Sequence, residues 1–184
     1  MANPDGFVNM VIHKLQDDET KKSRDTAFRP AMRMANTDTK GISKSWQHFT
    51  RYCDITNEKE LKAFALIGSA LAKSGNPPKA NGHLEIGAAL NVYYSAKGRN
   101  NNDEYGIDKA AKARFIRLIA CDTTEEACTI LRPMLNLINS DGGTIPINYI
   151  HLLKDLLVDD EKFNEQIKPR WAKNFYQGIK EAEE

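Results

Sequence analysis

IDKAAKARFIRLIAC, at residues 107–121, is the stretch of sequence that decides the fold. In a helix, where each residue turns the chain by about 100°, its apolar residues share one arc: Ile107, Ala111, Phe115, Leu118 and Ile119. Lys109, Lys112 and Arg117 fall outside this arc, and Arg114 lies at its margin. The pattern predicts a helix with one side in the core and one cationic side.

The charges of this predicted helix are unusually one-sided. Its only acid is Asp108, in the first turn, so the cations are not interleaved with carboxylates as on an ordinary solvated helix face. This asymmetry favours a phosphate-binding surface. A plain amphipathic helix of an unrelated protein could carry the same pattern, so the helix alone does not decide the function.

Two further helix starts carry capping signals. Asn57 with Glu60 predicts the start of a core helix that Gly75 ends. Thr123 with Glu126 forms a capping box, in which the hydroxyl accepts from a backbone amide and the carboxylate accepts from the amide of Thr123 itself. The helix that follows should run to about Asn139.

The last part of the chain predicts two more helices. Pro146 suits the first turn of a helix, where its missing N–H has no partner in any case. Its buried side would carry Leu152, Leu153, Leu156 and Leu157. A stripe at intervals of four follows, formed by Phe163, Ile167, Trp171 and Phe175. Because Pro169 lies inside this stripe, we expect a kink or a restart there.

These helices define the predicted fold class, all-α. No run of β-branched residues alternates over enough positions to indicate a strand. Loop-forming residues concentrate at 74–82 and 98–103. We therefore expect residues 1–184 to form a single helical protein of two small packed bundles joined by a flexible loop, an amino-terminal lobe at about 1–94 and a carboxy-terminal lobe at about 107–184.

Composition limits the possible functions. Twenty-six basic residues against 25 acidic ones leave a net charge of +1, so any attraction to nucleic acid must come from a patch. Three cysteines, and an opening MANPDG without signal-peptide features, point to the reducing cytoplasm. The longest uncharged apolar stretch, 63–72, is too short to span a membrane.

No motif for catalysis, nucleotide binding or metal binding is present. The four histidines, at positions 13, 48, 83 and 151, lie far apart, and none has the spacing to a cysteine or carboxylate that a metal site needs. No G-x-S-x-G, G-x-x-x-x-G-K or H-E-x-x-H occurs. We therefore expect no enzyme activity, no metal, no cofactor and no small-molecule substrate.

Several motifs in the second half resemble one known family. They include residues 113–122 (ARFIRLIACD), 131–135 (LRPML), 147–149 (INY), 152–157 (LLKDLL), 170–176 (RWAKNFY) and 83–90 (HLEIGAAL). In order and spacing, these motifs are similar to those of CasB, the small subunit of the type I-E CRISPR Cascade complex. The resemblance is good over 83–178.

The resemblance implies a non-catalytic helical subunit of an RNA-guided surveillance complex in antiviral defence. Its partners would be the other Cascade subunits, a second copy of itself, the crRNA and the target DNA. It would bind the displaced non-target strand and the crRNA–target heteroduplex, and so stabilise the R-loop. Such binding needs cations along a backbone and no base-reading motif.

Carried over residue by residue, the resemblance implies ten nucleic-acid contacts. Those inside the matched motifs are Arg114, Arg117, Arg132, Lys154 and Arg170. Further candidates are Lys112, Lys162, Arg29, Arg33 and Arg51. Some of these cations could instead pair with acids inside the protein, as Arg170 could with Glu161 or Glu165.

Two other functions stay open from the sequence. A helical protein–protein adaptor would need the amphipathic helices and none of the cationic face. A nuclease would need metal ligands that the sequence does not display.

Overall fold

The computed structural model of the chain describes residues 2–19, 26–35, 39–74, 78–97, 109–140 and 145–177. Every element in these ranges is helical, which confirms the predicted all-α class. The helices are α1 (Pro4–Glu19), α2 (Phe28–Met34), α3 (Thr39–Ser43), α4 (Trp46–Phe49), α5 (Glu58–Lys73), α6 (Ile86–Lys97), α7 (Lys109–Ala120), α8 (Thr124–Ser140), α9 (Tyr149–Leu156), α10 (Asp160–Lys162), the π-helical η1 (Phe163–Ile167) and α11 (Lys168–Gln177).

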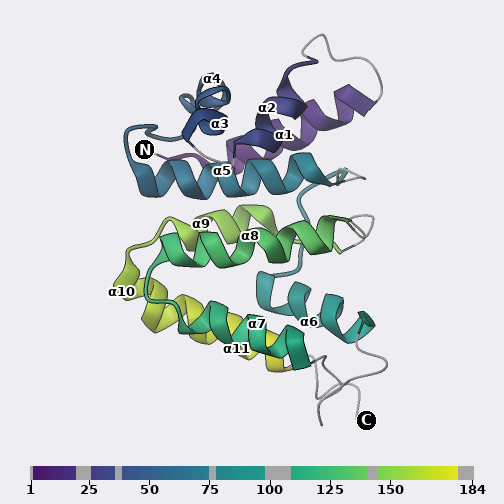
Figure 1. Cartoon of the computed structure of the whole chain (residues 1–184), viewed down its shortest axis with the longest axis vertical. Coiled ribbons are helices and arrows are strands. Elements are labelled where there is room, and N and C mark those ends of the chain that lie inside the picture. Colours follow the sequence, from purple (N-terminus) through teal and green to yellow (C-terminus); the bar gives the residue numbers. More distant parts are fainter. Residues whose placement is uncertain are drawn as a thin grey trace.

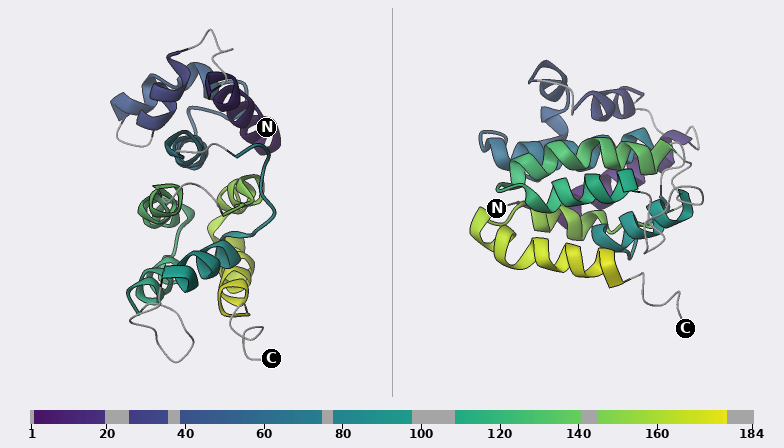
Figure 2. Two further views of the ribbon diagram at one scale, coloured as in Figure 1. Left: turned by 90° about the vertical axis from the view of Figure 1, so that its right-hand side faces the viewer. Right: turned by 60° about the horizontal axis from the view of Figure 1, so that its bottom comes forward.

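The long helices form two layers. α5, α8 and α7 lie one below the other in Figure 1, with α9 behind α8 and α11 behind α7. Seen from the side in the left view of Figure 2, α7 and α8 lie on one side, and α1, α9 and α11 lie on the other. α6 packs against α11. The division into an amino-terminal and a carboxy-terminal lobe stays a prediction.

α5 is the most deeply buried helix, because α1, α2, α8 and α9 all pack against it. Every residue from 63 to 72 is buried. The predicted cap is confirmed, since Oδ1 of Asn57 accepts from the backbone N–H of Glu60 at 3.2 Å. The helix ends at Lys73, and the predicted stop at Gly75 lies outside the described residues.

α8 begins with half of the predicted capping box. The hydroxyl of Thr123 accepts from the N–H of Glu126 at 3.2 Å, as predicted. The carboxylate of Glu126, however, accepts from the N–H of Asp122 at 3.0 Å and not from that of Thr123. The predicted donor to Glu126 is therefore wrong by one residue. The chain before the helix turns the amide of Asp122, and not that of Thr123, toward the carboxylate. α8 ends at Ser140, close to the expected Asn139.

The predicted role of Pro146 is wrong. α9 starts at Tyr149, and Asn148 caps it by accepting from the N–H of His151 at 2.9 Å. Pro146 lies before the helix, where its carbonyl accepts from Leu84 and the neighbouring Ile147 forms an isolated parallel bridge with Leu84. The carbonyl groups of Pro146 and Ile147 accept hydrogen bonds from the backbone N–H groups of Leu84 and Gly82, which precede α6. The sequence around Pro146 gives no sign of this long-range pairing. Leu152, Leu153 and Leu156 are buried as expected, and Leu157 is half-buried.

The aromatic stripe of the last helix is confirmed as core, since Phe163, Ile167, Trp171 and Phe175 are all buried. The break expected near Pro169 occurs before it, as the π-helical segment η1. The N–H of Lys168 bonds to the carbonyl of Phe163, five residues back. This wider turn makes room for a ring that would crowd a regular α-helical turn.

The three cysteines are free and buried. Burial raises the pKa of Cys53 and of Cys128 to about 12. Within the described ranges, no helix is long and apolar enough to cross a bilayer.

Candidate nucleic-acid interface

α7 carries the predicted cationic side. Ala111, Phe115 and Leu118 are buried, and the ring of Phe115 stacks on Phe175 of α11 with centroids 3.8 Å apart. Arg114 and Arg117 are exposed. The predicted first turn, with Ile107 and Asp108, lies outside the described residues. The packing of one side thus leaves the two arginines facing away from the core.

Arg114 and Arg117 line a groove of about 220 Å³ between α7 and α8. Its remaining wall comes from α8: Thr129, Ile130, Pro133, Met134 and Leu137. Arg117 also borders the adjoining hollow that leads to Cys121 and Glu126. No carboxylate of the described residues pairs with either arginine.

Arg132 lies on the other flank of α8. Glu125, two turns earlier on the same side of the helix, pairs with Lys62 of α5 at 2.8 Å, so this flank faces α5. Arg132 is close enough to Lys73, at the end of α5, to lower the pKa of Lys73, although burial is the larger cause. The Nε of Arg132 is buried without a hydrogen-bond partner among the described residues.

The amino-terminal candidates lie on different elements. Arg33 of α2 donates from Nε to the carbonyl of Ala72 on α5 at 2.9 Å, so it lies beside Lys73. Arg29 is half-buried one turn earlier on α2. Arg51 is exposed and lines a separate hollow with Lys14 and His48. The structure thus brings only Arg33 to the end of α5.

Lys154 belongs to the other layer. Its Nζ pairs with Asp5 of α1 at 2.9 Å, and the two side chains are 51% and 54% exposed. Lys162 is exposed on α10, and the half-buried Lys112 lies on α7. Neither is among the residues that line the groove. Lys154, in particular, does not join the arginines of α7 and α8.

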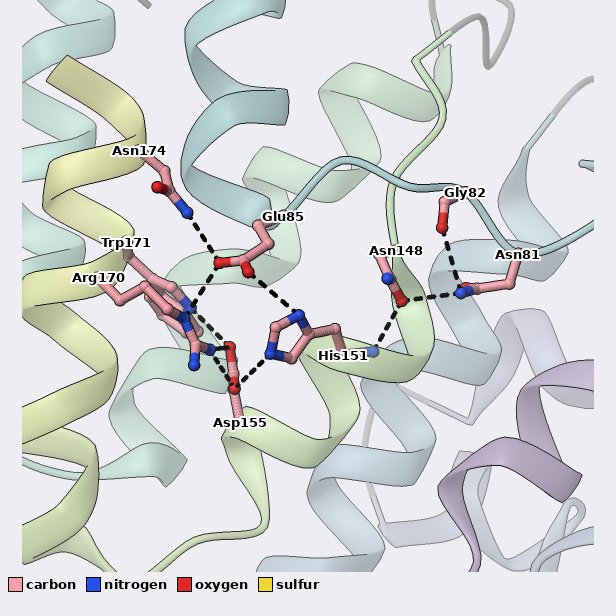
Figure 3. Close-up of polar contacts among 9 residues, drawn as sticks. All are labelled: Asn81, Gly82, Glu85, Asn148, His151, Asp155, Arg170, Trp171 and Asn174. Atoms are coloured by element: carbon pink, nitrogen blue, oxygen red, sulfur yellow. Dashed lines mark hydrogen bonds and ion pairs between the residues drawn. The ribbon is translucent and has the colours of Figure 1, made fainter. Parts of the chain in front are cut away.

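Arg170 is bound inside a polar network between α6, α9 and α11 (Figure 3). Its Nη2 donates to both carboxylate oxygens of Asp155 at 2.5 Å, and its Nε lies 3.1 Å from Glu85. The alternative that Arg170 pairs with acids inside the protein is confirmed, but the partners are not Glu161 and Glu165. They lie on the neighbouring helical turns in sequence, whereas the fold brings Asp155 and Glu85 to the guanidinium from other helices.

The same carboxylates bind further residues. Nε1 of Trp171 donates to Asp155 at 2.8 Å, and Asn174 donates to Glu85 at 2.8 Å. His151 lies between the two acids, 3.3 Å from Glu85 and 3.7 Å from Asp155. Figure 3 shows these side chains converging on the two acids. These contacts join α9, α11 and the start of α6, and so stabilise the packing of the three helices.

The five contacts predicted within the matched motifs therefore separate into two sets. Arg114, Arg117 and Arg132 flank the exposed side of α8, whereas Lys154 and Arg170 pair with acids in the opposite layer. Sequence reasoning missed Lys73. In the sequence, Lys73 is only the residue at which the apolar stretch 63–72 ends. No pattern of neighbouring residues indicates that Arg33 and Arg132 would lie near it.

No group of three or more His, Cys, Asp or Glu side chains that could hold a metal ion occurs in the part of the chain that the structure describes. The arrangement around α8 offers cations and an apolar groove.

One family model matches the chain. Residues 18–176 match the family model described as CRISPR-associated protein Cse2. Among curated proteins the chain finds no match.

Two solved structures have a similar fold. One is a chain of a CRISPR RNA-guided surveillance complex, with a TM-score of 0.69 and 15% identity over 98% of this chain and 95% of that one. The other is M. ruber CasB, with a TM-score of 0.63 and 22% identity over 100% of this chain and 98% of that one. At these identities the likeness concerns the fold.

Proposed function

The chain belongs to the Cse2 family of CRISPR-associated proteins, and we therefore propose that it is a non-catalytic small subunit of a type I-E Cascade surveillance complex. The family match confirms the resemblance inferred from the sequence. In this role the chain works in the cytoplasm beside other Cascade subunits and a second copy of itself. It binds nucleic-acid backbone and so stabilises the R-loop in antiviral defence.

One observation carries the proposal: Arg114, Arg117 and Arg132 flank the exposed side of α8, and no acid of the described residues pairs with any of them. Unpaired cations on rigid helices suit the phosphates of a displaced DNA strand or of a crRNA–target heteroduplex. Contacts of this kind position a strand without reading its bases. Near-zero net charge is compatible with this role because the attraction is local.

Binding of the purified chain to labelled oligothymidylate and to an RNA–DNA heteroduplex, followed by fluorescence anisotropy, tests the proposal. Three phosphate contacts at about 0.7 each predict a logarithmic salt slope of about −2, hence a roughly 20-fold loss of affinity between about 50 and 200 mM salt. The double variant Arg114→Glu/Arg117→Glu should lose most of the affinity. A circular-dichroism melt shows whether that variant remains folded.

The matched control is Lys154→Glu/Lys173→Glu, which makes the same change of charge at two exposed positions of the opposite layer. It should bind like the unmodified chain. Affinity that does not change with salt, or that falls equally in the control and in the double variant, would contradict the proposal.

A helical adaptor without nucleic-acid binding is the second candidate. The observation in its favour is the apolar wall of the groove, where Leu137 is 39% exposed and Ile130 and Pro133 lie beside it. Charge reversal at Arg114 and Arg117 separates the two functions. An adaptor would keep its partner and show no nucleic-acid affinity to lose.

A further inference from the structure

Three cations from three helices lie near the carboxy-terminal end of α5. Arg33 of α2 reaches the carbonyl of Ala72, the half-buried Lys73 follows directly, and Arg132 of α8 lies within electrostatic reach of Lys73. We call these residues, Arg33, Lys73 and Arg132, the α5-end cluster. The packing of α2 and α8 on α5 fixes their relative position.

The α5-end cluster has no acid of its own among the described residues. The carboxylates of α5 and α8 are Glu58, Glu60, Glu125 and Glu126, all in the first turns of their helices and so at the opposite end of α5. There, Lys62 pairs with Glu58 at 2.7 Å and with Glu125 at 2.8 Å. At the amino-terminal end of α5, the charge of Lys62 is thus neutralised by acids of α5 and α8. At the carboxy-terminal end, neither helix supplies an acid to Lys73 or Arg132.

The backbone of α5 compensates only a small part of this charge. A helix carboxy-terminus carries the equivalent of about −0.5 charge, against three full positive charges. The pKa of Lys73 is accordingly lowered, first by burial and then by the charge of Arg132. The free protein therefore holds these groups together at a cost that an anion would remove.

Donor capacity at the cluster is also unused. The Nε of Arg132 is buried without an acceptor among the described residues, and Arg33 uses its Nε on Ala72, which leaves its two terminal nitrogens for another acceptor. A buried donor without a protein partner needs an acceptor from ordered water or from a bound ion, and an oxygen of a phosphate group would serve.

We propose that the α5-end cluster is a binding site for one phosphate group, in which Arg33, Lys73 and Arg132 bind the oxyanion from three helices. Two guanidinium groups and an ammonium suit a phosphate with several acceptor oxygens better than a single planar carboxylate. The phosphate is a diester of the nucleic-acid backbone if the proposed function holds, and the inference rests on that function only for this source. Free phosphate has the same chemistry.

The test observes Lys73 directly by NMR in the full chain. The ¹H–¹³C signals of its ε-methylene group are assigned by their loss in Lys73→Gln, and they are followed during titration with inorganic phosphate and, separately, with oligothymidylate. We expect a saturable shift of the Lys73 signal that is absent in Arg132→Gln and unchanged in Lys173→Gln. Lys173 is exposed on α11 and serves as the matched control.

Anisotropy gives the second measurement. Lys73→Gln should weaken oligothymidylate binding by about three- to tenfold, the size of one phosphate contact, and should make the salt slope shallower by about 0.7. If Arg132→Gln does not fold, the titration of Lys73 in the unmodified chain still decides the outcome.

Each outcome has one meaning. A shift with both probes supports the site and assigns it to backbone phosphate, and a shift with inorganic phosphate alone supports it with free phosphate as the source. A Lys73 signal that moves with neither probe overturns the site, even if oligothymidylate binds through Arg114 and Arg117. If oligothymidylate does not bind at all while inorganic phosphate shifts Lys73, the proposed function fails and the site stands.

Discussion

Arg170 of α11 binds the buried carboxylate of Asp155 on α9, with Nη2 2.5 Å from each of its oxygens. Asp155 is 5% exposed, and Trp171 donates to the same carboxylate. A carboxylate at this depth needs such partners, because a buried ion without them is strongly destabilising. The pair therefore gives Arg170 a structural role, with partners that the sequence did not indicate.

Arg170→Met should accordingly destabilise the fold. Loss of one partner from a buried pair costs about 3–5 kcal/mol, and the partial exposure of Arg170, 33% of its side chain, reduces this to roughly 2–4 kcal/mol. Urea unfolding measures the change. Lys173→Met, at an exposed position of the same helix, should change the free energy of unfolding by less than about 0.5 kcal/mol. Equal effects of the two substitutions would show that the pair contributes nothing.

Gly87→Ala should destabilise the fold by disturbing the packing of α6 on α11. A Cβ at Gly87 would overlap the backbone carbonyl oxygen of Trp171, and a carbonyl in the middle of a helix cannot move aside. Alanine at an ordinary helix position stabilises by about 1 kcal/mol relative to glycine, so the sign of the effect is diagnostic. We expect a loss of roughly 1–3 kcal/mol in thermal or urea unfolding. Ala96→Gly, at an exposed position of α6, is the control for propensity alone, and a stabilised Gly87→Ala would contradict the close approach.

The carboxylate of Asp160 should make the free energy of unfolding depend on pH in the acidic range. The pKa of Asp160 is lowered below its ordinary 3.8, chiefly because its carboxylate accepts from the backbone N–H of Thr124, with Lys59 adding to the effect. A lowered folded-state pKa means that the stabilisation is present above the unfolded-state value and is lost as pH falls through the folded-state value. The side chain is 47% exposed, so the effect should be about 1 kcal/mol or less.

Urea unfolding at about pH 6 and about pH 3 measures this contribution. Asp160→Asn should lose stability at the higher pH and should show a smaller fall toward the lower one. Glu161→Gln, which removes an exposed carboxylate from the next position, controls for the loss of charge. An identical pH profile for Asp160→Asn and the unmodified chain would exclude the contribution of Asp160.

Lys154→Gln should change neither the stability of the fold nor the affinity for nucleic acid appreciably. Its ion pair with Asp5 joins two side chains that are both more than half exposed, and surface pairs of this kind contribute about 0–1 kcal/mol. We expect a change of less than about 0.5 kcal/mol in the free energy of unfolding and unchanged affinity for oligothymidylate. A clear loss of affinity without unfolding would return Lys154 to the nucleic-acid surface.

The fold was largely predictable because its signals are local. The cap at Asn57, the end of α8 and the buried stripe from Phe163 to Phe175 each follow from residues within a few turns of one another. Pro146 was misread because its structural partner, Leu84, lies in a distant segment. A pattern of proline and leucines cannot report such a pairing.

The site was less predictable for the same reason. The helical spacing placed Arg117 outside the apolar arc of α7 and Arg114 at its margin, and both are exposed, since the geometry of a single helix determines their positions. Whether a cation is paired depends on acids from other helices, as Lys154 with Asp5 and Arg170 with Glu85 show. Lys73 could not be recognised at all, because its neighbours Arg33 and Arg132 come from two other helices.

The buried thiols give the chain reporters of its own local unfolding. Because burial raises the pKa of Cys53 and of Cys128 to about 12, both thiols react slowly while their surroundings stay folded. With a thiol-exchange reagent in such excess that reaction is faster than reclosing, labelling proceeds at the rate at which each region opens. Cys53 precedes α5 and Cys128 lies on α8, so mass spectrometry of partly labelled chains would time the opening of the two regions separately, without any added probe.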